Sequence, residues 1–150
     1  MALASGTLSA DTINVLNTVV VGSAFTGGIF GSVGDNAALG TPGATLNAIT
    51  VDSVNVTGTS SVGGVAGFVR AQSMLTEIMV NNATVSGTTV VGGMLGELTD
   101  DAALDNSAIA VDSVIATVIG TGNSIGGVVG RLSIDTSITC LLYTSDAADE

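Results

Sequence analysis

The heptapeptide GGVAGFV at residues 63–69 has three relatives elsewhere in this 150-residue chain. All copies follow the pattern Gly-Gly-apolar-x-Gly-x-apolar, and the others are GGIFGSV at 27–33, GGMLGEL at 92–98 and GGVVGRL at 126–132. Successive copies start 36, 29 and 34 residues apart. Self-similarity with a period of roughly 20–50 residues is the signature of repeat proteins, so the chain is predicted to consist of stacked repeats.

A second repeated unit alternates with the first. It reads ITVDSVNV at 49–56, IMVNNATV at 78–85 and IAVDSVIA at 109–116, with a weaker copy at 13–20 and the start of a further copy at Ile138. Apolar residues alternate with polar ones in this unit, which puts the apolar ones on one face of a strand. The alternation slips by one residue at a small polar pair, so we expect a bulge or corner at Asp52-Ser53, Asn81-Asn82 and Asp112-Ser113.

One such repeat is too small to bury its apolar face alone, but repeats stacked about 4.8 Å apart in a parallel ladder bury it between them. Equivalent inward positions then form columns, predicted as Ile49, Ile78 and Ile109 in one and Val51, Val80 and Val111 in the next. The same alignment places Asp52, Asn81 and Asp112 in one outer column, where the neutral amide separates the carboxylates. The fold class predicted for residues 1–139 is all-β, a parallel β-helix (β-solenoid) of about three to four coils that is incomplete at one or both ends.

The glycine unit is predicted to be a tight turn followed by a short strand. Its structural repeat glycines are Gly27, Gly28, Gly31, Gly63, Gly64, Gly67, Gly92, Gly93, Gly96, Gly126, Gly127 and Gly130. A glycine pair before a strand suits a turn with positive φ. The strand face that holds the third glycine between two apolar residues is predicted to point inward. Ser32, Glu97 and Arg131 mark the opposite face as the solvent side, where Glu97 and Arg131 are expected to form an exposed ion pair.

Four apolar residues share that outer face, namely Phe30, Ala66, Leu95 and Val129. Either they form an apolar stripe for a partner, or the connecting segments between repeats cover them. We favour the second interpretation, with Leu39, Leu75 and Leu104 lying over the stripe. The connecting segments 35–39 and 100–104 are each expected to form a helical turn with the first Asp as N-cap.

The last eleven residues, CLLYTSDAADE at 140–150, differ from everything before them. They hold the single Cys and the single Tyr of the chain, and the high content of Val, Gly and Thr that marks the repeats stops there. The string resembles the translation of a sequencing-library transposase adapter. We therefore treat 140–150 as an adapter-derived artefact tail and expect 1–139 to be a fragment of a longer, metagenomic reading frame.

Composition excludes several functional classes. The chain has no His, only two basic residues, Arg70 and Arg131, and a formal net charge of −11, so it lacks the cationic patch that nucleic acids and anionic membranes require. Without His or Lys it also lacks nucleophile–base systems and phosphate-binding Lys loops. Although 46% of the residues are hydrophobic, no apolar stretch approaches the ~18 residues of a spanning helix. We expect no enzyme activity, no cofactor and no membrane insertion.

Carboxylates offer the remaining candidate chemistry. Asp100, Asp101 and Asp105 cluster within six residues, and hard cations favour oxygen ligands, so these three form a candidate calcium site whose simpler interpretation is a solvated acidic loop. Asp100 and Asp101 could also act as the carboxylate pair of a glycosidase. The equivalent segment begins Asp35-Asn36, which argues against a catalytic pair.

The glycine unit, followed by strands that end in Val56-Thr57-Gly58 or Val85-Ser86-Gly87, resembles the GLUG-motif repeats of bacterial filamentous-haemagglutinin-like surface adhesins. The resemblance covers residues ~10 to 139. It implies a right-handed β-helix shaft that is exported to the cell surface, and it brings no catalytic residues. The expected function is a structural or adhesive segment that presents a repetitive polar surface to host-surface or extracellular carbohydrate or protein, and that joins the remainder of its own polypeptide. The alternatives are a non-catalytic part of a β-helix carbohydrate-active enzyme and a phage tail or fibre module.

Overall fold

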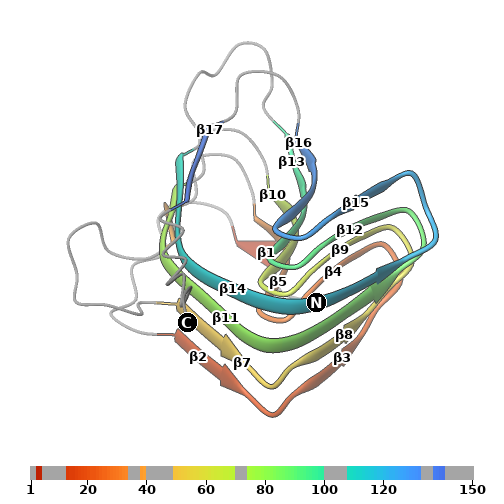
Figure 1. Ribbon diagram of the computed structural model, residues 1–150, viewed down its shortest axis with the longest axis horizontal. Coiled ribbons are helices and arrows are strands. Elements are labelled where there is room, and N and C mark those ends of the chain that lie inside the picture. The colour runs from red at the N-terminus through yellow and green to blue at the C-terminus, as the bar shows by residue number, and fades with distance from the viewer. Residues whose placement is uncertain are drawn as a thin grey trace, which may run out of the picture.

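The computed structural model describes residues 3–4, 13–33, 38–39, 49–69, 74–99, 108–132 and 137–140. Within these residues every regular element is a β-strand and no helix occurs (Figure 1). The prediction of an all-β protein is therefore confirmed. The expected helical turn at 35–39 is wrong where it can be examined, because Ala38–Leu39 forms a short strand that pairs with residues 74–75. The corresponding segment at 100–104 lies outside the described residues.

The strands fall into successive groups that we call passes. The first pass contains β2 (Ile13–Leu16), β3 (Val19–Val21), β4 (Phe25–Gly27) and β5 (Phe30–Val33). The second contains β7 (Ile49–Asp52), β8 (Asn55–Thr57), β9 (Ser61–Gly63) and β10 (Ala66–Val69). The third contains β11 (Met74–Gly87), β12 (Val90–Gly92) and β13 (Leu95–Leu98), and the fourth β14 (Ala108–Gly120), β15 (Ser124–Gly126) and β16 (Val129–Leu132). Three further short strands are β1 (Leu3–Ala4), β6 (Ala38–Leu39) and β17 (Ser137–Cys140).

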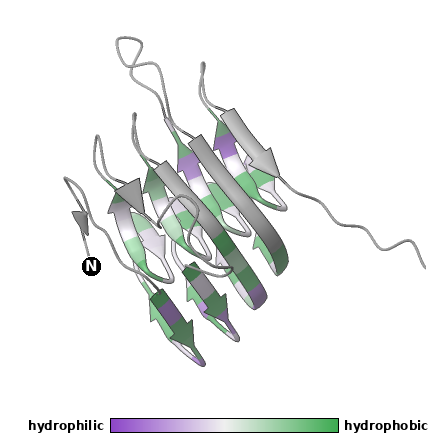
Figure 2. Ribbon diagram, turned by 90° about the vertical axis from the view of Figure 1, so that its left-hand side faces the viewer, coloured by the Kyte–Doolittle hydropathy of each residue, from purple (hydrophilic) through white to green (hydrophobic). Residues whose placement is uncertain are grey.

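Equivalent strands of successive passes pair with one another, and every pairing is parallel. The result is an eight-stranded sheet, a four-stranded sheet ordered β15-β12-β9-β4, and a five-stranded sheet ordered β1-β5-β10-β13-β16. Figure 1 shows that each pass runs along the eight-stranded sheet, turns back through the four-stranded sheet and enters the five-stranded sheet. Figure 2 shows the passes side by side. The predicted parallel stacking of repeats is confirmed.

Inward apolar columns form as predicted between the second and third passes. Ile78 pairs with Ile49 and Val80 with Val51, and all four side chains are fully buried. They belong to one core cluster of mainly Val, Ile and Leu. Because a fully buried side chain of this size contributes about 1.5–3 kcal/mol, such columns supply the main stabilising term of the stack.

The register predicted for β14 is wrong. Ile109 pairs with Leu75, and it is Val111 that continues the Ile49–Ile78 column. The ladder from β11 to β14 keeps an offset of 33–34 residues, which matches the 34-residue spacing of the glycine units. Asp112 has no partner in this ladder, so it does not continue the Asp52–Asn81 pairing, which itself is observed.

Corners are present at two of the three predicted polar pairs. Ser53 and Asn82 have positive φ values of 55° and 48°, and Asn17 has 50° at the equivalent place in the first pass. Small polar residues tolerate this left-handed conformation better than apolar ones do. At the third pair, Asp112-Ser113, the irregularity is a register shift of the bulge type: Ile78 pairs with Val111 and Met79 with Ser113, so Asp112 is the extra residue, and Ser113 has no positive φ.

The repeat glycines are required by close packing and not by backbone conformation. In the second, third and fourth copies none of them has a φ in the left-handed region, so the expected positive-φ turn is wrong there. A Cβ added at Gly64 would collide with the carbonyl oxygen of Gly93, and one at Gly93 with that of Gly127. A Cβ at Gly67 would lie 2.8 Å from the backbone carbon of Phe25 in the four-stranded sheet. The glycines therefore let successive turns nest and let the five-stranded sheet approach the four-stranded one.

Candidate functional site

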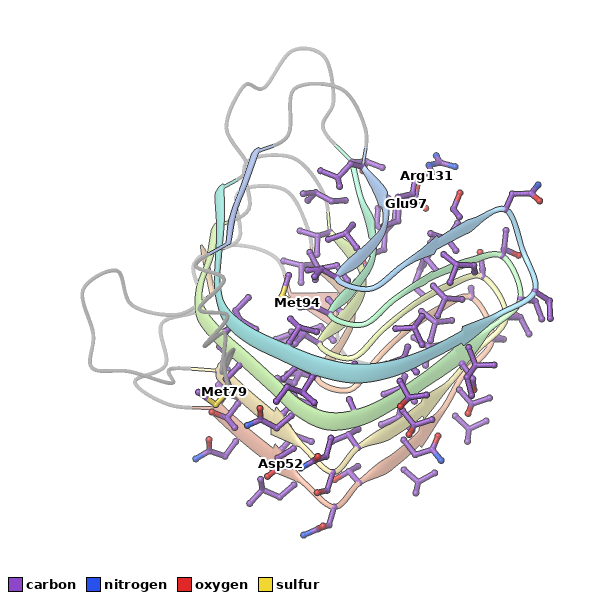
Figure 3. All side chains as sticks on the ribbon, in the orientation of Figure 1. Asp52, Met79, Met94, Glu97 and Arg131 are labelled. Atoms are coloured by element: carbon purple, nitrogen blue, oxygen red, sulfur yellow. The ribbon has the colours of Figure 1, made fainter. Side chains whose placement is uncertain are left out.

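A charged cluster lies where the five-stranded sheet meets the four-stranded sheet. Glu97 of β13 pairs with Arg131 of β16, with 2.7 Å between Oε1 and Nη2 (Figure 3). The hydroxyl of Ser61 in β9 donates a hydrogen bond of 3.0 Å to the other carboxylate oxygen of Glu97. One ring contact, with centroids 4.8 Å apart, joins Phe25 to Phe68 across the same pair of sheets.

This arrangement confirms the predicted pairing of Glu97 with Arg131 but corrects its setting. Glu97 is only 8% exposed and Ser32 is also buried, so the side of the strand predicted to face solvent is largely covered. Arg131 is the exposed member, with 54% of its side chain accessible. The four-stranded sheet covers this face, as the Ser61 hydrogen bond shows. Both oxygens of Glu97 have partners, and the cluster contains no second acid or base, so its chemistry is that of a structural contact.

The hypothesis of an exposed apolar stripe is wrong for three of its four residues. Phe30, Ala66 and Leu95 are buried and belong to the main core cluster, and Val129 is partly buried against it. The side chains of Leu39, Leu75 and Leu104, which were expected to cover the stripe, lie outside the described residues.

Polar side chains cover the outer face of the eight-stranded sheet in the two middle passes. We call this set the polar ladder, and it comprises Asp52, Asn55 and Thr57 of the second pass and Asn82, Thr84 and Ser86 of the third. The hydroxyls of Thr57 and Ser86 are 3.1 Å apart, and the amide of Asn82 donates to Asp52 over 3.3 Å. Hydrogen bonds between neighbouring strands therefore hold four of these six side chains in place, and Asn55 pairs with Thr84 in the strand register between them.

The column of Thr57 and Ser86 ends at apolar residues on both sides, Val21 and Ile119, a feature that was not predicted from the sequence. The column of Asn55 and Thr84 ends at Val19 in the first pass and at the polar Thr117 in the fourth. Among the side chains that the structure describes, the exposed large apolar ones lie in the first and fourth passes: Leu16, Val19, Val21 and Phe25 in the first, and Ile115, Ile119, Ile125 and Leu132 in the fourth. The signal was present in the sequence, because INVLNTVV at 13–20 replaces the polar positions of its sister copies with Leu and Val.

A hollow of about 460 Å³ opens at the edge of the first pass. Its lining residues are Val20, Val21, Gly22, Ser23, Ala24, Phe25, Thr26, Gly27, Gly28, Ile29 and Gly31. The hydroxyl of Thr26 is buried there and has no hydrogen-bond partner. Val62 and Val91 occupy the same column in the second and third passes, so Thr26 is a buried polar member of an otherwise apolar column.

The predicted calcium candidates Asp100, Asp101 and Asp105 lie outside the described residues. Among the residues that the structure describes, no group of three or more acidic, Cys or His side chains is placed to hold a metal ion. The same part of the chain contains no helix with the length and hydropathy that a bilayer crossing needs.

Comparisons with known proteins found no matching family model, no matching curated protein and no matching solved structure.

Proposed function

We propose that the chain is a right-handed β-solenoid of about three to four coils, each pass being one coil, and that it serves as a structural or adhesive segment of a secreted or cell-surface protein. Parallel pairing of equivalent strands supports the solenoid. Right-handedness follows the strong general preference of parallel β-crossovers. The resemblance to GLUG-motif repeats points to the same architecture and to the cell surface.

The observation that carries the adhesive role is the polar ladder. It presents hydroxyl, amide and carboxylate groups in rows at the spacing of neighbouring strands, about 4.8 Å. Such rows offer many donors and acceptors to an extended carbohydrate or protein, whereas the described residues show no catalytic constellation. Each contact is weak, and repetition along the shaft raises the overall affinity. Extracellular carbohydrate is therefore the ligand class that we test first.

The test is binding of the immobilised chain to a panel of soluble polysaccharides and extracellular-matrix proteins. We expect the double substitution N55A/T84A, which removes two side chains of the polar ladder, to lower binding about tenfold or more, equivalent to roughly 1.4 kcal/mol. The matched control is T121A, at an exposed turn outside the ladder. Absence of binding across the panel, or equal losses in both variants, would reject the adhesive role and leave a scaffold of a carbohydrate-active enzyme or a phage fibre as the remaining proposals.

A further inference from the structure

We propose that the ligand of the polar ladder is a polysaccharide of amino sugars with free, protonated amines, and that the carboxylate of Asp52 binds one of these amines. This inference rests on the proposed adhesive function and deepens it, because it names the class of carbohydrate. The competing ligand classes are neutral polysaccharides, anionic polysaccharides and basic peptides, and the binding experiment distinguishes them.

Asp52 carries the one charge without an ionic partner among the side chains that the structure describes. The charged side chains in that part of the chain are Asp52, Glu97 and Arg131, and Glu97 is neutralised by Arg131 at 2.7 Å. The whole chain has a formal net charge of −11 with only two basic residues. Its long-range field therefore repels polyanions and attracts polycations, and Asp52 is the point in the polar ladder where a cation gains most.

Two residues at corners of the eight-stranded sheet hold the carboxylate of Asp52 in place. Its Oδ1 accepts a hydrogen bond of 3.0 Å from the hydroxyl of Ser53 and one of 3.3 Å from the side-chain amide of Asn82. Both donors lie at the positive-φ corners, and Figure 3 shows Asp52 at the bottom of the view, where this sheet bends. Within the described residues both bonds go to Oδ1, so Oδ2 is the atom offered to a ligand.

The composition of the polar ladder matches an amino sugar better than a basic peptide. The ladder holds one carboxylate, two amides and three hydroxyls. An amino sugar likewise carries one amine among several hydroxyls, whereas a lysine-rich peptide carries an amine on every side chain and no hydroxyls. One amine can therefore pair with Asp52 in a charge-assisted hydrogen bond, while the neutral groups of the ladder exchange hydrogen bonds with the hydroxyls of the sugars.

The extent of the polar ladder favours a polymer over a single amino sugar. Asn55 and Thr57 point to the same side of β8 and lie about 6.7 Å apart along the strand, and their partners Thr84 and Ser86 lie one strand further on, about 4.8 Å away. Asp52 precedes them, at the end of β7. A chain of sugars can contact the carboxylate and several of these neutral groups together, and simultaneous contacts raise the overall affinity.

Binding of the full chain to soluble polymers, at mildly acidic pH and low ionic strength, tests the proposal. Glycol chitosan carries free amines, and the same polymer after N-acetylation keeps the sugar backbone without the charge. Polygalacturonate serves as the anionic polysaccharide and polylysine as the basic peptide. We expect glycol chitosan to bind about tenfold more tightly than its N-acetylated form, and this difference to disappear at about 1 M salt, where the screening length is about 3 Å.

Substitutions at the carboxylate locate the contact. D52N keeps the size of the side chain, and the fold accommodates Asn there because Asn81 occupies the same place in the third pass. We expect D52N to lower the affinity for glycol chitosan about fivefold, as for one partly exposed ion pair, and to leave the N-acetylated polymer unaffected. N81D adds a carboxylate about 4.8 Å from Asp52 and should raise the affinity for glycol chitosan. The matched control D146N makes the same change in net charge outside the repeats and should change nothing.

Circular dichroism of each variant checks that the fold is kept. Equal binding of glycol chitosan and its N-acetylated form, or tighter binding of polygalacturonate, overturns the amine contact but leaves the adhesive function standing. Equal losses in D52N and D146N overturn it too, because net charge alone would then explain the binding. Polylysine that binds as tightly and is as sensitive to D52N would identify a basic peptide as the ligand and overturn the assignment. If no polysaccharide binds the parent chain, carbohydrate is rejected as the ligand class, and this inference fails with it.

Discussion

A single methyl group added at Gly96 should destabilise the fold strongly. A Cβ added there would lie 2.5 Å from the amide nitrogen of Val62 and 2.8 Å from the carbonyl carbon of Ser61, and closer still to the carbonyl oxygen of Gly67. All of these are backbone atoms of strands that are paired on both sides, so they cannot turn away as a side chain can. Overpacking of a core costs about 1–3 kcal/mol where side chains adjust, and we expect G96A to lose about 3 kcal/mol or more.

Gly127 is the matched control, because the same methyl group meets nothing there. Its backbone has no positive φ, so Ala adds no strain and should change stability by less than about 1 kcal/mol, in the stabilising direction. Urea titration followed by circular dichroism, on samples dilute enough to be single chains, measures both variants. With a slope of about 1–3 kcal/mol per molar urea, the midpoint of G96A should fall by roughly 1–3 M. Equal midpoints for G96A and G127A would refute the idea that the glycines are needed for close packing of the sheets.

The other predictions concern single contacts, each measured by the same urea titration. S61A should cost about 1–3 kcal/mol, because it leaves one oxygen of the nearly buried Glu97 without its donor, whereas R131A should cost less since that guanidinium is more than half exposed; a larger loss in R131A would contradict this order. N82A should cost about 1–2 kcal/mol relative to N82G, because the φ of 48° disfavours Ala, and equal stabilities would argue against the corner. T26V should raise stability by about 1 kcal/mol, since it removes a buried hydroxyl without a partner and extends the valine column, and a loss would show that the hydroxyl has a partner.

Repetition made the parallel stack predictable. Gly-Gly units and Ile-x-Val units recur along the chain, and the strands of the first three passes pair where those units align. The register of β14 was predicted wrongly because the sequence allows two different alignments of the fourth pass with the third. Matching IAVDSVIA to IMVNNATV gives an offset of 31, whereas matching the glycine units gives 34, and the structure follows the glycines. Close packing at each glycine turn tolerates no slippage, while a strand absorbs an extra residue such as Asp112 as a local irregularity.

Burial of Glu97 and Ser32 could not be read from alternation alone. A strand pattern shows which residues share a face, but it does not show whether a second sheet covers that face. The one indication was that the column of Ser32 and Glu97 also contains an aromatic residue, Phe68, which lies between them. Solvated columns seldom hold a large aromatic residue, and here its ring contacts Phe25 of the neighbouring sheet.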